Sequence, residues 1–160
     1  MKNGIEIRDA TPADAGAIAA LWHAGWMDGH ADKASSELVA LRDRASFRVR
    51  TDRHIGDFRV AMVGPMLLGF HLCKGDEVSQ FYVASEARGT GFARSLMADA
   101  EAKVKAAGHK RIWLACGIGN DRARRFYEKT GWTFAGTERQ EMETAGEPIH
   151  LDIWRMEKDL

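Results

Sequence analysis

Cysteine is scarce in this sequence, which holds only Cys73 and Cys116 among its 160 residues. Two thiols cannot build a disulfide framework, and the chain contains no C-x-x-C pair. His23, His30 and His54 lack the spacing of metal ligands. We therefore expect no metal and a reducing, cytoplasmic setting.

Long apolar runs and net charge are also missing. The sequence contains no run of about 18 apolar residues, the length that a membrane-spanning helix requires. Its first ten residues lack the apolar core of a secretory signal. The formal net charge is zero, so no overall field attracts nucleic acid or an anionic membrane, and we expect neither as a partner. A chain of 160 residues with 45% hydrophobic and 29% charged residues predicts a single globular domain over residues 1–160.

Hydrophobic patterning predicts a mixed sheet. Strands are expected at residues 5–10, 58–63, 67–73, 77–83, 111–116, 132–137 and 150–156. The three from 58 to 83 are separated by turn signals and should form an antiparallel meander. Strands 77–83 and 111–116 flank a helix, so they should be parallel neighbours.

Helices fill the remaining apolar segments. They are expected after a capping box at Thr11-Pro12-Ala13-Asp14, more weakly over residues 36–47, from Gly91 to Gly108, and from a cap at Asn120 to Gly131. Residues 28–36 are expected to form a loop. The sum is an α/β (α+β) fold, a mixed sheet with helices on both faces.

One segment, SEARGTGFARSLM at residues 85–97, puts two glycines between a strand and a helix. Unpaired amides at a helix start, with glycines that permit close approach, suit a phosphate group. A Walker loop is excluded because no Gly-Lys-Ser/Thr is present, and a dinucleotide fingerprint because position 94 is arginine. The glycines alone leave a tight turn without a ligand equally open.

Two motifs together carry a resemblance to a known family. Residues 88–93, RGTGFA, fit the signature Q/R-x-x-G-x-G/A of the Gcn5-related N-acetyltransferases (GNAT family). Residues 120–132, NDRARRFYEKTGW, resemble the family's second signature, N-x-x-A-x-x-F-Y-x-x-x-G-F, with Trp132 in place of Phe. The element order is similar over nearly the whole chain. The resemblance implies the GNAT fold, with a mostly antiparallel central sheet and one splayed parallel pair.

The resemblance also implies a site for acetyl-CoA as co-substrate. Main-chain groups of residues 88–94 would hold the diphosphate, and those near Tyr82, Val83 and Ser85 the pantetheine arm, with the Val83 amide polarising the thioester carbonyl. Asn120 would approach the cofactor and Tyr127 would face the departing sulfur. The implied cofactor-binding residues are Tyr82, Val83, Ser85, Arg88, Gly89, Thr90, Gly91, Phe92, Ala93, Arg94, Asn120 and Tyr127.

The implied reaction is direct acetyl transfer to a primary amine through a ternary complex, with catalytic roles for Tyr127, Glu77 and Val83. Tyr127 would protonate the thiolate, and a base must take the proton of the amine. Glu77 is the first candidate for that base, because residues 77, 79, 81 and 83 share a face if the strand is regular; a bulge would shift that facing. Glu77 could equally be a solvated strand end, and Asp76, His71 and His150 are further candidates for the base.

The acceptor remains open between a small-molecule amine and a protein amine. The family builds the acceptor site from the first helix, the loop after it and the closing hairpin, here Trp22, Trp26, Met27, Asp28, His30 and residues 138–150. The tryptophans could simply be core, and the acidic stretch 138–147 would suit a cationic amine. A non-catalytic acyl-CoA-binding sensor or interaction module is the alternative function, and a homodimer is possible.

Overall fold

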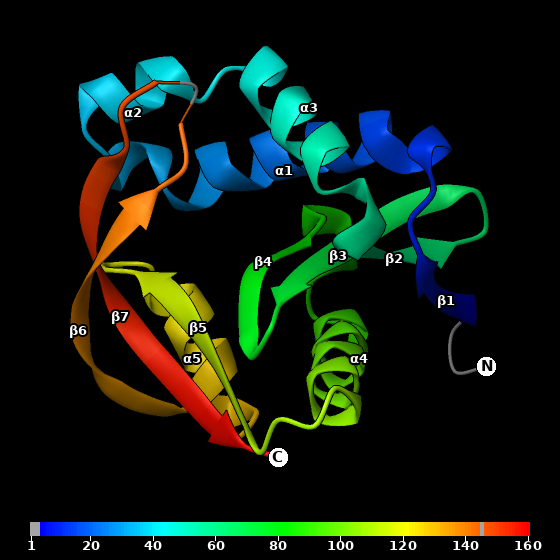
Figure 1. The fold of residues 1–160 in the computed structure, drawn as a ribbon. Coiled ribbons are helices and arrows are strands. Elements are labelled where there is room, and N and C mark those ends of the chain that lie inside the picture. The colour runs from blue at the N-terminus through cyan, green and yellow to red at the C-terminus, as the bar shows by residue number, and fades with distance from the viewer. Residues whose placement is uncertain (1–3, 145) are drawn as a thin grey trace.

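The computed structural model describes residues 4–144 and 146–160. Seven strands form one sheet in the order β1-β2-β3-β4-β5-β7-β6, and only the β4–β5 pair is parallel (Figure 1). The strands are β1 (Ile5–Asp9), β2 (Phe58–Val63), β3 (Met66–Lys74), β4 (Glu77–Val83), β5 (Arg111–Gly117), β6 (Thr133–Met142) and β7 (Ile149–Asp159). The predicted mixed, mostly antiparallel sheet is confirmed, and the two closing strands are longer than the apolar pattern indicated.

Helices cover both faces of this sheet. They are α1 (Ala15–Gly29), α2 (Ser36–Leu41), α3 (Arg44–Arg53), α4 (Phe92–Ala106) and α5 (Asp121–Lys129). In Figure 1, α1, α2 and α3 lie along one side of the strands and α4 along the other. Among the described residues, no helix has the length and apolar character that crossing a bilayer requires.

The predicted single helix over residues 36–47 is wrong, because two helices meet there. α2 ends at Leu41, and α3 begins at Arg44 after the cap residue Asp43, whose carboxylate accepts the Ser46 amide at 2.8 Å. A side chain that caps a new helix competes with continuation of the old one. The expected loop at 28–36 is also shorter, since α1 runs to Gly29 and a 3-10 turn follows.

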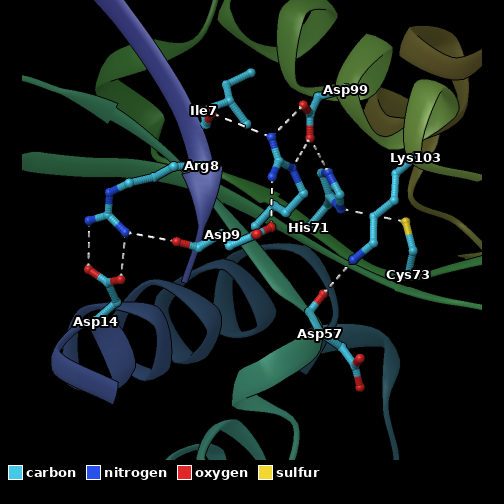
Figure 2. A network of polar contacts seen from close by, with 10 residues as sticks. Ile7, Arg8, Asp9, Asp14, Asp57, His71, Cys73, Asp99 and Lys103 are labelled. Carbon is cyan, nitrogen blue, oxygen red and sulfur yellow. Dashed lines mark hydrogen bonds and ion pairs between the residues drawn. The ribbon is translucent and has the colours of Figure 1, made fainter. Parts of the chain in front are cut away.

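A polar network under α4 fastens that helix to the sheet (Figure 2). The Asp99 carboxylate accepts two hydrogen bonds from Arg59, at 2.7 and 3.0 Å, and one from His71 Nε2 at 2.7 Å. Burial lowers the pKa of His71, which is fully enclosed and stays neutral. Burial opposes ionisation of Asp99, but the hydrogen bonds from His71 and Arg59 outweigh it and hold the Asp99 pKa to about 2. His71 is therefore a structural histidine.

The parallel strands β4 and β5 part almost at once. Their register contains one pair, Glu77 with Trp113, and beyond it the strands are not paired. Asp76 braces the closed end, because its main-chain oxygen accepts the Trp113 amide at 3.1 Å and its carboxylate accepts the indole N–H at 3.0 Å. The rest of the β4 edge is therefore free to meet a ligand, as the expected splayed pair requires.

Candidate functional site

A cavity of about 420 Å³ fills the space where β4 and β5 diverge. We call it the cleft; its walls are residues 78–83 of β4, residues 114–117 of β5, the start of α4 and one face of α5. The Ala84 amide donates to Leu68 O at 2.8 Å, on the β3 side. Since successive strand amides alternate between the two edges, the amides of Phe81 and Val83 point into the cleft.

The glycine segment forms the mouth of this cleft. Gly89 and Gly91 have φ angles of 75° and 82°, and Gly91 is the N-cap of α4. A Cβ at either position would meet nothing within 4 Å, so the left-handed backbone, and not crowding, calls for glycine. Thr90 Oγ1 donates to Ala87 O at 2.6 Å and fixes the turn. The Phe92 amide donates to Thr90 Oγ1 at 3.4 Å, and the amides of Ala93 and Arg94 that follow it in α4 have no acceptor within the helix.

Most of the predicted cofactor residues meet at the cleft, but several do not. Its wall includes Tyr82, Val83, Arg88, Gly89, Ala93, Asn120 and Tyr127. Ser85, Thr90, Gly91, Phe92 and Arg94 are not in the wall. The Phe92 side chain is buried in the core against β1 and β2, and Arg94 is exposed to solvent. Any part that Phe92 takes in binding must therefore come from its main chain.

Asn120 and Tyr127 reach the cleft from α5. Asn120 Oδ1 accepts the Ala123 amide at 3.3 Å, which confirms the predicted cap. Tyr127 is 9% exposed, and burial raises the pKa of its hydroxyl. Burial likewise raises the pKa of Cys116, another residue of the wall, to about 11. Cys116 is thus an inert filler, and Tyr127 stays protonated over the neutral range.

Arg88 is already paired at the rim of the cleft. Arg88 and Arg122 each donate to the same oxygen of Asp28, at 2.9 Å, and these hydrogen bonds lower the pKa of Asp28. The acceptor role expected for Asp28 therefore has no support, because this side chain bridges the C-terminal end of α1 to the cleft mouth. The bridge also brings Arg122 of α5 to this rim.

A second cavity, of about 350 Å³, adjoins the cleft. The residues lining both are His30, Ser79, Gln80, Tyr82, Ala115 and Gly117. α1 can pass directly over the Tyr82 ring because position 25 is glycine; a Cβ there would lie 2.3 Å from the ring. Of the residues predicted for the acceptor site, Trp22, Trp26 and His30 line this cavity, while Met27 does not. Ala145, within the predicted segment 138–150, lies outside the described residues.

A bulge in β4 decides which side chains enter the second cavity. Leu72 pairs with Gln80 and Cys73 with Val78, so one residue of β4 is extra. The prediction that 77, 79, 81 and 83 share a regular face is therefore wrong, and the bulge named as its alternative is present. Glu77 lines the second cavity, while Phe81 packs toward α5, stacked on Phe126. Burial raises the pKa of Glu77.

The other predicted bases lie elsewhere. His71 and His150 line neither cavity, and His150 is partly exposed beside Glu141. The sequence analysis missed two residues of the second cavity, Arg42 and Arg50, which are 5% and 7% exposed. No motif marks them, because an arginine in an amphipathic helix is normally a surface residue.

The chain is similar to known acetyltransferases in both sequence and fold. The acetyltransferase (GNAT) family model matches residues 26–132. Uncharacterized N-acetyltransferases of Mycobacterium bovis and Mycobacterium tuberculosis are 40% identical over 70 residues, a match that spans 41% of this chain and 45% of the length of those relatives. A GCN5-related N-acetyltransferase from Rhodopseudomonas palustris has a TM-score of 0.73 at 25% identity, covering 97% of this chain and 95% of that one. PaiA N-acetyltransferase from Thermoplasma acidophilum, solved with coenzyme A, has a TM-score of 0.67 at 21% identity, over 98% and 99% of the two chains.

Proposed function

Because this chain belongs to the GNAT family of acetyltransferases, we propose that it transfers the acetyl group of acetyl-CoA directly to a primary amine held beside it. One observation carries the proposal: the cleft between β4 and β5 and the second cavity share a wall. A thioester in the cleft and an amine in the second cavity would therefore be neighbours. Holding both reactants replaces a bimolecular encounter with a positioned one.

The fit to acetyl-CoA rests on the main chain. The amides of Ala93 and Arg94, in the first turn of α4 after the Gly91 cap, have no acceptor within the helix and suit a diphosphate. Acetyl-CoA supplies an activated thioester. Val83 lies closest to the diphosphate end of β4, which suits its amide to the pantetheine arm. The Phe81 amide lies deeper, by the shared wall, about 7 Å from that of Val83. One carbonyl cannot accept from both, so the Phe81 amide takes the donor role toward the thioester carbonyl that the resemblance implied for Val83.

Glu77 and Tyr127 divide the proton transfers in this proposal. The raised pKa of Glu77 makes its carboxylate a stronger base near neutral pH. Glu77 and Phe81 are four residues apart on β4, about 13 Å, so Glu77 would act through water. Tyr127, buried at the floor of the cleft, would hand its proton to the thiolate as the sulfur departs.

Release of coenzyme A thiol over a panel of primary amines tests this function. We expect amine-dependent release and an acetylated product in at least one case, with micromolar binding of acetyl-CoA in calorimetry. Tight binding of acetyl-CoA without turnover on any amine would favour the non-catalytic binding module instead. Absence of both binding and turnover would remove the proposal.

A further inference from the structure

Two guanidinium groups lie in the second cavity without partners. Arg42 ends α2 and Arg50 belongs to α3, and both side chains are more than nine-tenths buried. Nε and Nη1 of Arg42, and Nε and Nη2 of Arg50, are enclosed and have no hydrogen-bond partner among the described residues. Buried charges in proteins are normally paired. Four orphaned donors on one cavity wall therefore point to a missing acceptor group.

The two side chains are held in place. The Arg50 guanidinium lies over the rings of Trp22 and Phe47, at 4.4 and 4.5 Å from their centroids. Stacking occupies the face of the guanidinium and leaves the N–H groups in its plane free. Arg42 sits at the break between α2 and α3, next to the cap residue Asp43. The wrongly predicted continuous helix would have placed Arg42 differently, so the break helps to build this wall.

The inner wall of the second cavity is positive. Burial lowers the pKa of Arg50 to about 10, with repulsion from Arg42 adding to it, and burial also lowers the pKa of Arg42; both stay charged at neutral pH. Glu143 also lines this cavity and its charge acts on both arginines, but its carboxylate bonds to Arg53 and His54 and not to them. The other charged residues of this cavity are less buried: Lys33, Lys74, Glu77, Glu141 and Asp152.

We infer that the acceptor is a small amine that also bears a carboxylate, as an amino acid does, and that Arg42 and Arg50 bind this carboxylate. This rests on the proposed function. Guanidinium groups bind carboxylates through paired, charge-assisted hydrogen bonds. Arg42, Arg50 and Tyr82 line the same cavity, and Tyr82 also lines the cleft, so a carboxylate bound by the arginines lies in the cavity that shares a wall with the cleft. A cavity of about 350 Å³, flanked by Trp22 and Trp26, suits a molecule of this size.

Matched acids and amides test the inference. The rate of thiol release is measured at saturating acetyl-CoA for free amino acids, β-alanine and the carboxamide of each, and for C-amidated peptides that begin with aspartate. We expect kcat/KM for the preferred acid to exceed that of its amide by about 100-fold or more. Equal rates for acid and amide would overturn the inference and leave the acetyltransferase function standing. A peptide preferred over every free amino acid would overturn it as well.

Variants separate binding from structural support. Arg42→Met and Arg50→Met should reduce the preference for the acid to about tenfold or less, mainly through KM of the acceptor, with unchanged affinity for acetyl-CoA. Arg48→Gln is the control, since Arg48 lies on the same helix but is exposed and paired with Asp52. Removing an unpaired buried charge should leave the Tm of the free protein equal or higher. A lower Tm with an unchanged preference would show that the arginines are structural and would overturn the inference.

Discussion

Buried charged side chains have hydrogen-bond partners on one face of the sheet and lack them on the other. Under α4, Arg59, Asp99 and His71 satisfy one another through hydrogen bonds of 2.7 to 3.0 Å. Under α2 and α3, Arg42 and Arg50 are more deeply buried than Arg59 and Asp99, but Nε and one terminal nitrogen of each have no hydrogen-bond partner among the described residues. Both faces must offset the cost of removing charge from water. The first does so within the fold, and the second, in our proposal, does so by binding the carboxylate of the acceptor.

The two polar clusters are therefore expected to serve different purposes, one structural and one in binding the acceptor. The network on the α4 side fixes the helix whose N-terminus we propose as the diphosphate site, so its loss should affect stability. In our proposal the arginines on the α1–α3 side contact the acceptor, so their loss should affect KM. This difference can be tested with one variant that gives Arg42 a partner and another that removes the partner of Arg59 and His71.

Arg50→Glu should have the largest effect. The new carboxylate would lie beside Arg42 and pair with it inside the second cavity. The acceptor carboxylate would then lose both donors and meet a negative charge, so kcat/KM for the acidic acceptor should fall about 1000-fold. Acetyl-CoA affinity, measured by calorimetry, should stay within about twofold. The matched control is Arg48→Glu on the exposed side of α3; a fall below tenfold for Arg50→Glu would contradict the contrast.

Glu77→Gln should lower kcat by about 100-fold. Glu77 must be deprotonated to act as a base, so the wild-type rate should rise as pH increases through its raised pKa. The variant should lack this acidic limb in a pH–rate profile. Glu141→Gln removes an exposed carboxylate from the same cavity and should retain the limb. An acidic limb that survives in Glu77→Gln would exclude Glu77 as the base.

Tyr127→Phe should lower kcat by about tenfold, less than a typical general acid contributes, because a thiol leaves moderately well unaided. The ring and its packing on Trp132 remain, so KM for acetyl-CoA should hardly move. Tyr127→Phe should thus change kcat, whereas the variants of Arg42 and Arg50 should change KM for the acceptor. Steady-state kinetics with unchanged turnover would remove Tyr127 from the catalytic group.

Asp99→Asn should act on stability alone, lowering the free energy of unfolding by roughly 1 to 2 kcal/mol after allowance for partial exposure. The Asp99 pKa is held to about 2, below the reference value of about 3.9. Its stabilisation is therefore complete above pH 4 and lost as the pH falls toward 2. Denaturant titrations across that range should show this acid-sensitive portion in the wild type and lack it in the variant.

Asp9→Asn is the control for that measurement. Asp9 also bonds to Arg59, at 2.7 Å, but its side chain is 83% exposed, so its loss should cost less than about 0.5 kcal/mol. Turnover should be unchanged in both variants. Equal destabilisation by Asp9→Asn and Asp99→Asn would contradict the idea that the contribution of Asp99 to stability depends on its burial.

Local signals in the sequence predicted much of this structure. Gly89 and Gly91 lie between a strand and a helix, Asn120 precedes an amphipathic segment, and both patterns depend on neighbours in the chain. The meander of β2, β3 and β4 and the parallel β4–β5 pair followed from short connections and one crossover, whereas the place of β7 between β5 and β6 was not predicted. The break at Asp43 was missed because an apolar pattern over residues 36–47 outweighed a single capping residue.

The acceptor side could not be predicted in the same way. The bulge in β4 depends on pairing with β3, and the bridge of Asp28 to Arg88 and Arg122 joins residues 60 and 94 positions apart. The significance of Arg42 and Arg50 lies in missing partners, which a sequence cannot show. The acidic stretch 138–147, which would suit a cationic amine, gave no sign of a carboxylate on the acceptor.

A crystal structure of the protein with coenzyme A tests the central claim most directly. We predict the diphosphate on the first amides of α4, the pantetheine arm along the amides of Val83 and Phe81, and the sulfur beside Tyr127 at the wall shared with the second cavity. Coenzyme A bound at another surface, or with its sulfur turned away from that wall, would contradict the account.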